Sequence, residues 1–246
     1  MFSFATLFDL KNKQGKPLRK TGGRNFRIPL MGEKAPSFTC ESTEGTINFP
    51  FDFGRNWKVI LSHPMDFTPV CSTELIELAN LQSEFKNLGV NLLTVSTDPL
   101  ETHIQWKKVL EQIEYKQYSR QKINFPIVDD SNLVISKLYG MIHLESDNNR
   151  DVRGVFIIDP DNIIRAEFFY PQEVGRNMDE LLRTVIALKT TDSNNVMTPA
   201  NWKNGHDVLV PFPLKSNMSV MNKESGEYYQ YSWFLIFKKV INESTK

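Results

Sequence analysis

A single cysteine stands at a position where a protein could use it as a nucleophile. The chain of 246 residues contains two cysteines, and Cys71 follows a short apolar segment, residues 57–62. That segment contains β-branched residues and no 3.6-residue stripe, which predicts a buried strand. After it, Thr68 suits a helix N-cap and Pro69 suits the first helical position, where a missing N–H costs nothing. The spacing therefore predicts that Cys71 lies in the first turn of a helix.

The first turn of a helix favours a cysteine thiolate over a thiol. Unpaired backbone N–H groups and the positive end of the helix dipole both stabilise negative charge there. The helix is predicted from apolar residues at helical spacing after Cys71, with Gly89 as its stop. These apolar residues are Leu75, Leu78, Leu81 and Phe85. The alternative is a small buried core cysteine, because free Cys is among the most buried residue types. We interpret Cys71 as a reactive thiol.

The residues around Cys71 form a specific motif. Pro64-x-x-x-Thr68-x-x-Cys71, between a strand and a helix, resembles the signature of the peroxiredoxins, thiol peroxidases with a thioredoxin-like fold. His63 directly before Pro64, together with Glu74 after the cysteine, is similar to the one-cysteine subfamily in particular. Further matches follow in order: Ser96–Asp98, His103–Trp106, Phe125–Asp130, Arg153–Asp159, Tyr170–Pro171, Gly175–Asn177 and Thr198–Trp202. A match of this length is specific to the family.

The resemblance implies a role for each residue of the signature. Cys71 would attack a peroxide and become a sulfenic acid. Arg153 would lie on a neighbouring strand with its guanidinium near the sulfur, where it would stabilise the thiolate and bind peroxide oxygen. Thr68 would orient the peroxide, and Pro64 would shield the site from water. A plain N-cap for Thr68 and a plain turn residue for Pro64 stay open as alternatives.

Three further charged or titratable residues belong to the implied site. His63 would assist proton transfer or contact the reductant, unless it is a structural histidine with satisfied hydrogen bonds. Glu74 and Arg176 would orient Arg153 through charge-assisted contacts. The alternative for both is a pairing at the surface, which contributes little to stability.

The position of the second cysteine determines how the enzyme would be recycled. No cysteine follows Cys71 in the sequence. Cys40 precedes it, at a position that corresponds by resemblance to an ordinary strand or turn residue of the family. We therefore predict that Cys40 is structural. The resemblance then implies a one-cysteine cycle in which an external thiol, such as thioredoxin, a glutaredoxin or glutathione, reduces the sulfenic acid. The predicted function is a thiol-specific peroxidase for hydrogen peroxide and organic hydroperoxides, serving antioxidant defence and redox homeostasis without cofactor or metal.

Alternative functions would require other residues around Cys71. A thioredoxin-type reductase would need Cys-x-x-Cys, but Glu74 stands three residues after Cys71. A cysteine hydrolase would pair Cys71 with a base, for which the candidates are His63, His103 and His143. A non-enzymatic holdase or redox-signalling scaffold built from dimers is the third alternative. Some one-cysteine members also carry a lipase-type serine before the strand, but residues 53–58 contain none, so phospholipase activity lacks local support.

Strand-like and helix-like segments alternate along the chain, as in α/β folds. After the Cys71 helix we predict a strand at 90–95, helices at 100–118 and 131–139, strands at 154–158 and 163–169, and a helix at 178–189. The turn residues Asp159–Asn162 make the last two strands a hairpin, so the sheet should be mixed. The prediction is a thioredoxin-like fold with a mixed central sheet flanked by helices and a C-terminal dimerisation arm.

The chain divides into three predicted regions. Residues 1–31 form a basic flexible leader, 32–190 the thioredoxin-like peroxidase domain, and 191–246 the C-terminal peroxiredoxin arm, with a polar linker at 190–195. The arm contains a strand-like aromatic segment, Tyr228–Phe237. The resemblance implies that the arm wraps around a partner subunit in a homodimer, and that such dimers can assemble further into a ring. The alternative is that the arm packs on the core of its own chain.

Charge and hydropathy exclude several classes of partner. The 29 Lys and Arg balance the 29 Asp and Glu, so the chain lacks the basic field typical of nucleic-acid or anionic-membrane binding. No run approaches the roughly 18 to 20 apolar residues of a transmembrane helix. Two cysteines without repeated spacing do not form a disulfide framework, which favours a reducing compartment. We predict a cytoplasmic protein, or one in an organelle such as the mitochondrion if the basic leader is a transit peptide.

Overall fold

The structure, a computed structural model, is described for residues 27–142, 150–211 and 226–240. Its centre is a five-stranded sheet with the order β5-β4-β3-β6-β7. The strands are β3 (Trp57–Ser62), β4 (Val90–Ser96), β5 (Ile127–Asp129), β6 (Arg153–Ile158) and β7 (Ile164–Tyr170). β3, β4 and β5 are parallel, whereas β6 runs antiparallel to both β3 and β7. The predicted mixed sheet and the predicted β6–β7 hairpin are confirmed.

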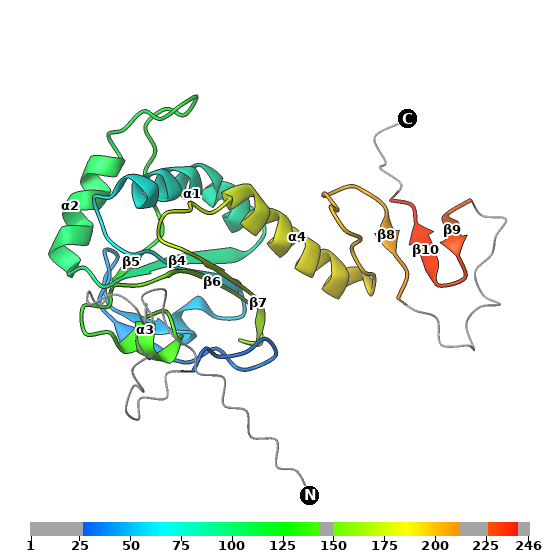
Figure 1. The fold of residues 1–246 in the computed structure, drawn as a ribbon, viewed down its shortest axis with the longest axis horizontal. Coiled ribbons are helices and arrows are strands. Elements are labelled where there is room, and N and C mark those ends of the chain that lie inside the picture. The colour runs from blue at the N-terminus through cyan, green and yellow to red at the C-terminus, as the bar shows by residue number, and fades with distance from the viewer. Residues whose placement is uncertain (1–26, 143–149, 212–225, 241–246) are drawn as a thin grey trace, which may run out of the picture.

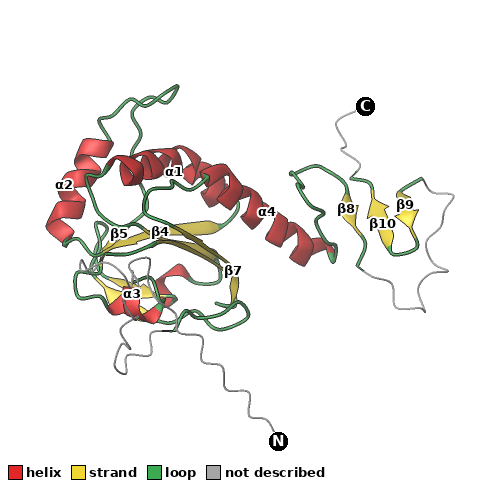
Figure 2. Cartoon of the chain, viewed as in Figure 1, coloured by secondary structure: helices red, strands yellow, loops and turns green. Residues whose placement is uncertain are grey.

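Helices cover both faces of this sheet (Figures 1 and 2). α1 (Pro69–Asn87) and α4 (Met178–Asn194) lie side by side on one face, with α2 (Leu100–Leu110) next to α1. The opposite face carries the short helix α3 (Val134–Leu138) and a hairpin of β1 (Phe38–Cys40) and β2 (Ile47–Phe49), followed by a 3-10 turn at Phe51–Phe53. The order of strands and helices is that of a thioredoxin-like fold.

The two faces of the sheet explain why β3 and β6 are buried along their whole length. Side chains of a strand alternate between faces, so a strand covered on both sides needs apolar residues throughout. Val59 and Leu61 pack in the cluster under α1 and α4, and this cluster contains Cys71. Ile60 and Phe156 pack in the cluster on the other face. The buried β3 therefore delivers the chain to the start of α1 in a fixed position.

A separate small sheet lies beyond the end of α4 (Figure 1). It contains β8 (Val208–Leu209), β9 (Tyr228–Ser232) and β10 (Leu235–Lys238) in the order β8-β10-β9. The aromatic segment predicted as one strand is thus a hairpin, because the chain reverses at Trp233 and Phe234. Trp202 and Val208 pack on Ala187 of α4 and anchor the unit.

The two long helices end at positions that differ from the prediction. α2 stops at Leu110, with Glu111 as its C-cap, instead of continuing to 118. Further along, Lys116 has a φ of 52°, outside helical geometry, in the turn between Tyr115 and Tyr118. α4 continues past 189 to Asn194, so the predicted linker at 190–195 is wrong. Its last turn is held by the Thr191 hydroxyl, which donates to the Leu188 carbonyl, and by hydrogen bonds from Arg165 to Asp192.

The remaining predictions concern a short helix, the N-terminal segment and membrane-spanning helices. The short helix predicted at 131–139 covers Val134–Leu138, after a Leu133 with positive φ. Most of the predicted basic leader, residues 1–26, lies outside the described residues. In the described ranges, no helix combines the length and the apolar character needed to cross a membrane.

Candidate active site

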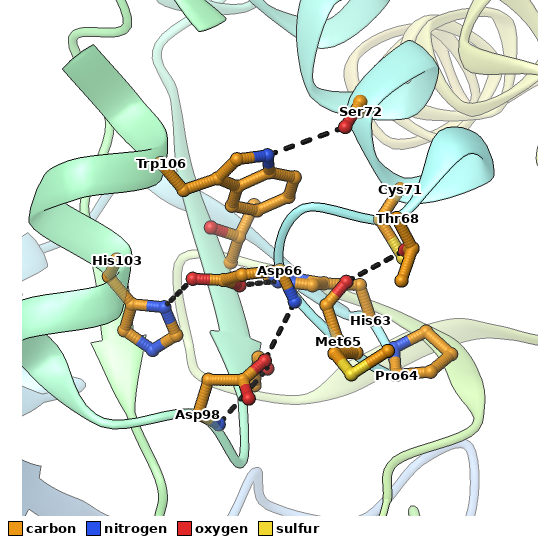
Figure 3. Close-up of polar contacts among 12 residues, drawn as sticks. His63, Pro64, Met65, Asp66, Thr68, Cys71, Ser72, Asp98, His103 and Trp106 are labelled. Atoms are coloured by element: carbon orange, nitrogen blue, oxygen red, sulfur yellow. Dashed lines mark hydrogen bonds and ion pairs between the residues drawn. The ribbon is translucent and has the colours of Figure 1, made fainter. Parts of the chain in front are cut away.

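Cys71 is the third residue of α1 and is completely buried. The chain leaves β3 at Ser62 and reaches the helix through a short loop (Figure 3). Thr68 is the N-cap residue and Pro69 the first helical residue, as predicted. The Thr68 hydroxyl, however, donates to the Met65 carbonyl at 2.8 Å instead of capping the helix. Phe67, directly before Thr68, has a φ of 56°, so the loop passes through a left-handed residue just before the helix begins.

Arg153 places its guanidinium against the sulfur. It is the first residue of β6 and is buried, and it lies two residues before Val155, which pairs with Leu61 of β3. Its Nη1 donates to Cys71 Sγ at 3.3 Å and to Glu74 Oε2 at 2.8 Å. Its Nε and Nη2 donate to the Gln172 carbonyl at 2.9 and 2.7 Å. The guanidinium is therefore held at both ends, and one of its N–H groups points to the sulfur.

Glu74 joins the two arginines that resemblance placed in the site. It lies three residues after Cys71, on the same helix face. Arg176 Nη2 donates to Glu74 Oε2 at 2.7 Å, and its Nε donates to Oε1 at 3.0 Å. Burial alone would raise the pKa of Glu74, but the charges and hydrogen bonds of Arg176, with the charge of Arg153, outweigh it and lower that pKa. Two guanidinium groups around one carboxylate leave a net positive charge in the network, and the Arg153 end of it contacts the sulfur.

His63 does not contact the sulfur through a hydrogen bond. It follows β3 directly, is buried, and its Nε2 lies 2.8 Å from Asp66 Oδ1. The other oxygen of Asp66 lies 2.6 Å from Nδ1 of His103 in α2. His63 packs against Trp106, with 5.1 Å between ring centroids, and the indole N–H donates to the Ser72 hydroxyl next to Cys71 (Figure 3).

Pro64 is buried in the same loop, and its carbonyl accepts from Nη1 of Arg150 at 3.2 Å. The loop is also tied down through Asp66, whose backbone N–H donates to Asp98 at 2.7 Å. Arg150, Asp98 and the Gln172 carbonyl are site partners that sequence reasoning did not single out. Asp98 and Asp66 stood inside the matched motifs, whereas the Gln172 contact uses a backbone carbonyl and leaves no signal in the side-chain types.

Cys40 has a different environment from Cys71. It lies in β1 and is half-buried with a free thiol. Burial, together with the negative charges of Asp130, Glu41 and Asp129, raises the pKa of Cys40 to about 12. A thiol with such a pKa is protonated at neutral pH and is a poor nucleophile.

The geometry does not support the hydrolase alternative. Within the described ranges, the hydrogen bonds of His63 and His103 go to Asp66 and to the Val128 carbonyl, and the donor at Cys71 Sγ is Arg153. His143, the third candidate base, lies outside the described residues.

Comparison with known proteins gives a consistent family. Residues 31–167 match the AhpC/TSA family, and residues 187–224 match the C-terminal domain of 1-Cys peroxiredoxin. A peroxiredoxin of Methanosarcina mazei is 42% identical over 215 residues, which are 86% of this chain and 98% of the relative. A 1-Cys peroxiredoxin of Dictyostelium discoideum is 39% identical over 180 residues, 73% of each chain.

Solved structures agree with these matches. A structure of the yeast mitochondrial 1-Cys peroxiredoxin has a TM-score of 0.74 and 36% identity, and the match covers 86% of this chain and all of that one. A cysteine-to-serine mutant of peroxiredoxin 6 of Arenicola marina has a TM-score of 0.76 and 27% identity, with 86% and 98% covered. Because these matches run through both the cysteine-bearing core and the C-terminal region, the chain belongs to the 1-Cys peroxiredoxins, which are thiol-dependent peroxidases.

Proposed function

We propose that this enzyme reduces hydrogen peroxide and organic hydroperoxides at Cys71 in antioxidant defence and redox homeostasis. The observation that carries the proposal is the 3.3 Å contact between Arg153 Nη1 and the Cys71 sulfur. The thiolate attacks the terminal peroxide oxygen, the O–O bond breaks, and the leaving oxygen takes a proton to become water or an alcohol. The sulfur is thereby oxidised to a sulfenic acid. Fixed guanidinium N–H groups stabilise negative charge both on the sulfur and on the leaving oxygen.

The sulfenic acid is then reduced by an external thiol. Cys40 precedes the site in β1, is protonated at neutral pH, and no cysteine follows Cys71. In the similar yeast mitochondrial 1-Cys peroxiredoxin, the thiol resolving mechanism works via glutathione/thioredoxin systems. A thiol of that kind, whether glutathione, a glutaredoxin or thioredoxin, is the reductant that we propose here. Excess peroxide carries the sulfenic acid to sulfinic acid and stops turnover.

The working form is proposed to be a homodimer in the cytoplasm. The hairpin of the C-terminal unit exposes Tyr231, Trp233 and Phe234, which together form an apolar surface suited to a subunit interface. Two free cysteines suit a reducing compartment. An organelle such as the mitochondrion remains the alternative, and it depends on the basic leader.

One experiment tests the chemistry of the proposal. Reduced protein is mixed with one equivalent of hydrogen peroxide and trapped with dimedone, and intact mass is measured for the wild type, Cys71→Ser and Cys40→Ser. We expect one dimedone adduct that maps to Cys71, is lost in Cys71→Ser and persists in Cys40→Ser. A disulfide between Cys40 and Cys71 would instead overturn the recycling scheme, and the absence of rapid oxidation would overturn the peroxidase.

A further inference from the structure

The segment that enters β6 carries two arginines that contact the active site, and a buried carboxyl lies between them in the sequence. Arg153 donates to the Cys71 sulfur at 3.3 Å. Three residues earlier, Nη1 of Arg150 donates at 3.2 Å to the carbonyl of Pro64, which belongs to the loop between β3 and Cys71 (Figure 3). Asp151, the residue between them that can ionise, has an exposed fraction of 0%.

Neither carboxyl oxygen of Asp151 has a hydrogen-bond partner within the described ranges. A buried carboxylate without donors or a counter-charge is unfavourable, whereas the protonated form carries no charge. Asp130, a second buried carboxyl, accepts from the backbone N–H groups of Ile135 and Ser136 at 2.9 and 2.7 Å and from the Ser136 hydroxyl. Those donors favour the charged form of Asp130. Of these two carboxyls, Asp151 is therefore the one that carries a proton.

The charged groups that face Asp151 act in the same direction. Burial raises the pKa of Asp151 well above its ordinary value, and the negative charges of Asp130, directly after β5, and Asp98, after β4, raise it further. Ser136 of α3 acts in the opposite direction and does not outweigh them. Among the described residues, no cation is paired with the Asp151 carboxyl, because the guanidinium of the neighbouring Arg150 contacts the Pro64 carbonyl and lies 3.9 Å from Asp98.

The backbone around Asp151 is bonded to the end of β3 and to Met141. The Ser62 hydroxyl donates to the Val152 carbonyl at 2.6 Å and accepts the Gly154 N–H at 2.9 Å. The Val152 N–H donates to the Met141 carbonyl at 2.7 Å. These contacts place the Asp151 side chain in the core, where its neutral form is tolerated and its charged form is not.

We propose that Asp151 is a pH-sensitive switch for the oxidation of Cys71. While its carboxyl is protonated, the segment stays buried and both arginines keep their contacts with the active site. When the carboxyl ionises, it moves towards water and draws Arg150 and Arg153 away from the Pro64 carbonyl and the sulfur. At most about 11 Å of chain joins the two arginines, so a displacement of Asp151 is passed to both.

The inference rests on the proposed peroxidase reaction and predicts a particular pH profile for it. A thiolate nucleophile alone gives a rate that rises with pH and then stays constant, because the thiolate is the reactive form. The switch adds a fall of the rate at higher pH, with its midpoint at the ionisation of Asp151.

Two substitutions keep the branched shape of the side chain but cannot ionise. Asp151→Asn and Asp151→Leu should both keep the segment in place at every pH at which they fold. Asp159→Asn is the matched control, because it makes the same exchange directly after the other end of β6. There Oδ1 accepts the N–H groups of Asp161 and Ile163, each at 2.9 Å, and the variant should retain the wild-type pH profile.

The first measurement is the protonation state of Asp151 in the wild-type protein, by NMR of its carboxyl carbon across the pH range in which the protein stays folded. The protein carries carbon-13-labelled aspartate, and either variant identifies the signal by removing it. We expect a carboxyl that ionises well above its ordinary value of 3.8. A carboxyl that ionises near that value, or that stays protonated throughout, overturns the switch.

The second measurement is the rate of Cys71 oxidation by hydrogen peroxide over the same pH range, by rapid mixing, acid quench and intact mass. We expect the wild-type rate to fall at least about tenfold above the midpoint of the Asp151 titration, because Arg153 no longer stabilises the thiolate and the leaving oxygen. Asp151→Asn and Asp151→Leu should show no such fall. An equal fall in a variant that folds, or a constant wild-type rate while Asp151 ionises, overturns the proposal.

The wild-type rate below the midpoint separates failure of the switch from failure of the proposed function. Rapid oxidation there without a later fall overturns the switch alone. Slow oxidation at every pH would overturn the peroxidase itself, and the switch with it.

Discussion

At the scale of the residue, reactivity depends on where one guanidinium is anchored. Arg153 contacts Cys71 Sγ through Nη1, while the Gln172 carbonyl and Glu74 hold the rest of the group. A lysine in its place would keep the charge but would not fill these four contacts, because its ammonium is a point charge without a planar fork. The chemistry therefore requires the shape of arginine as well as its charge.

Replacing Arg153 tests this dependence. We expect Arg153→Met to slow sulfenic acid formation by about 10²- to 10³-fold and Arg153→Lys to recover only part of that loss. The rate is followed by rapid mixing with hydrogen peroxide and dimedone trapping. Arg165→Lys on β7, which alters a pairing with Asp192 outside the site, is the control and should react at the wild-type rate. A wild-type rate for Arg153→Lys would contradict the role of the fork.

At the scale of the element, Glu74 joins α1 to β6 and to the segment that leads into α4. Its two oxygens accept from Arg153 and Arg176, and all three side chains are buried. Breaking a buried ion pair by removing one partner leaves uncompensated charge in the core. The network that organises the sulfur site is therefore also a structural tie between elements.

We expect Glu74→Gln to destabilise the protein by about 3 to 5 kcal/mol near neutral pH. Because folding lowers the pKa of Glu74, its contribution is present above its ordinary value near 4.5 and is lost as pH falls through the lower folded value. The difference between wild type and variant in urea unfolding should therefore shrink with falling pH. Glu77 lies on the same helix as Glu74 and forms an exposed ion pair with Lys116. Glu77→Gln should therefore lower the free energy of unfolding by less than about 1 kcal/mol.

The segment that leads into β6 contains a carboxyl group, that of Asp151, whose pKa is raised by folding, whereas the pKa of Glu74 is lowered. Asp151 is buried, and burial together with the charges of Asp130 and Asp98 raises its pKa well above the ordinary value. The folded state therefore retains its proton longer than the unfolded state, and stability falls as pH rises from about 4. We expect Asp151→Asn to become more stable relative to wild type as pH rises, measured by thermal unfolding. A constant difference across pH would show that this carboxyl does not titrate abnormally.

At the scale of the whole molecule, the C-terminal unit has apolar side chains that the described residues leave exposed. Its own core is small, with Trp202 and Val208 on α4, whereas Trp233 and Phe234 at the hairpin turn are more than half exposed. Surfaces of this kind are typical of subunit interfaces.

Replacement of Trp233 and Phe234 by serine should therefore weaken the proposed homodimer. We expect sedimentation velocity to show a dimer for wild type and a shift towards monomer for the double variant, by at least about tenfold in dissociation constant. Val134→Ser with Leu138→Ser, at exposed positions of α3, is the matched control and should leave the dimer intact. A monomeric wild type, or a double variant as dimeric as the control, would refute this interface.

The sequence by itself determined the family, the strand and helix that flank Cys71, the mixed sheet and the one-cysteine character. The family and the one-cysteine cycle follow from the resemblance of the motif Pro64–Cys71 together with the count and order of cysteines. The elements follow from local signals: buried β-branched runs, proline at a helix start and turn residues. The end of α4 was missed because Asp192 in its last turn pairs with Arg165 of β7, and the region predicted as the end of α2 instead contains a turn with Lys116 at positive φ. Propensity within a segment does not contain that information.

Only the tertiary structure decided how the site residues are connected. Resemblance placed Arg153, Glu74 and Arg176 near the sulfur. The tertiary structure brings Arg153 to Cys71 because β6 lies antiparallel to β3, and it brings the Gln172 carbonyl to Arg153 because β7 lies antiparallel to β6. His63 and His103 are 40 residues apart in the sequence, yet their ring centroids lie 6.4 Å apart and both rings hydrogen-bond to Asp66, because the loop and the helix follow adjacent parallel strands. The other nitrogen of His103, Nε2, lies 3.1 Å from the Val128 carbonyl of β5, a backbone contact that no pattern of side chains encodes.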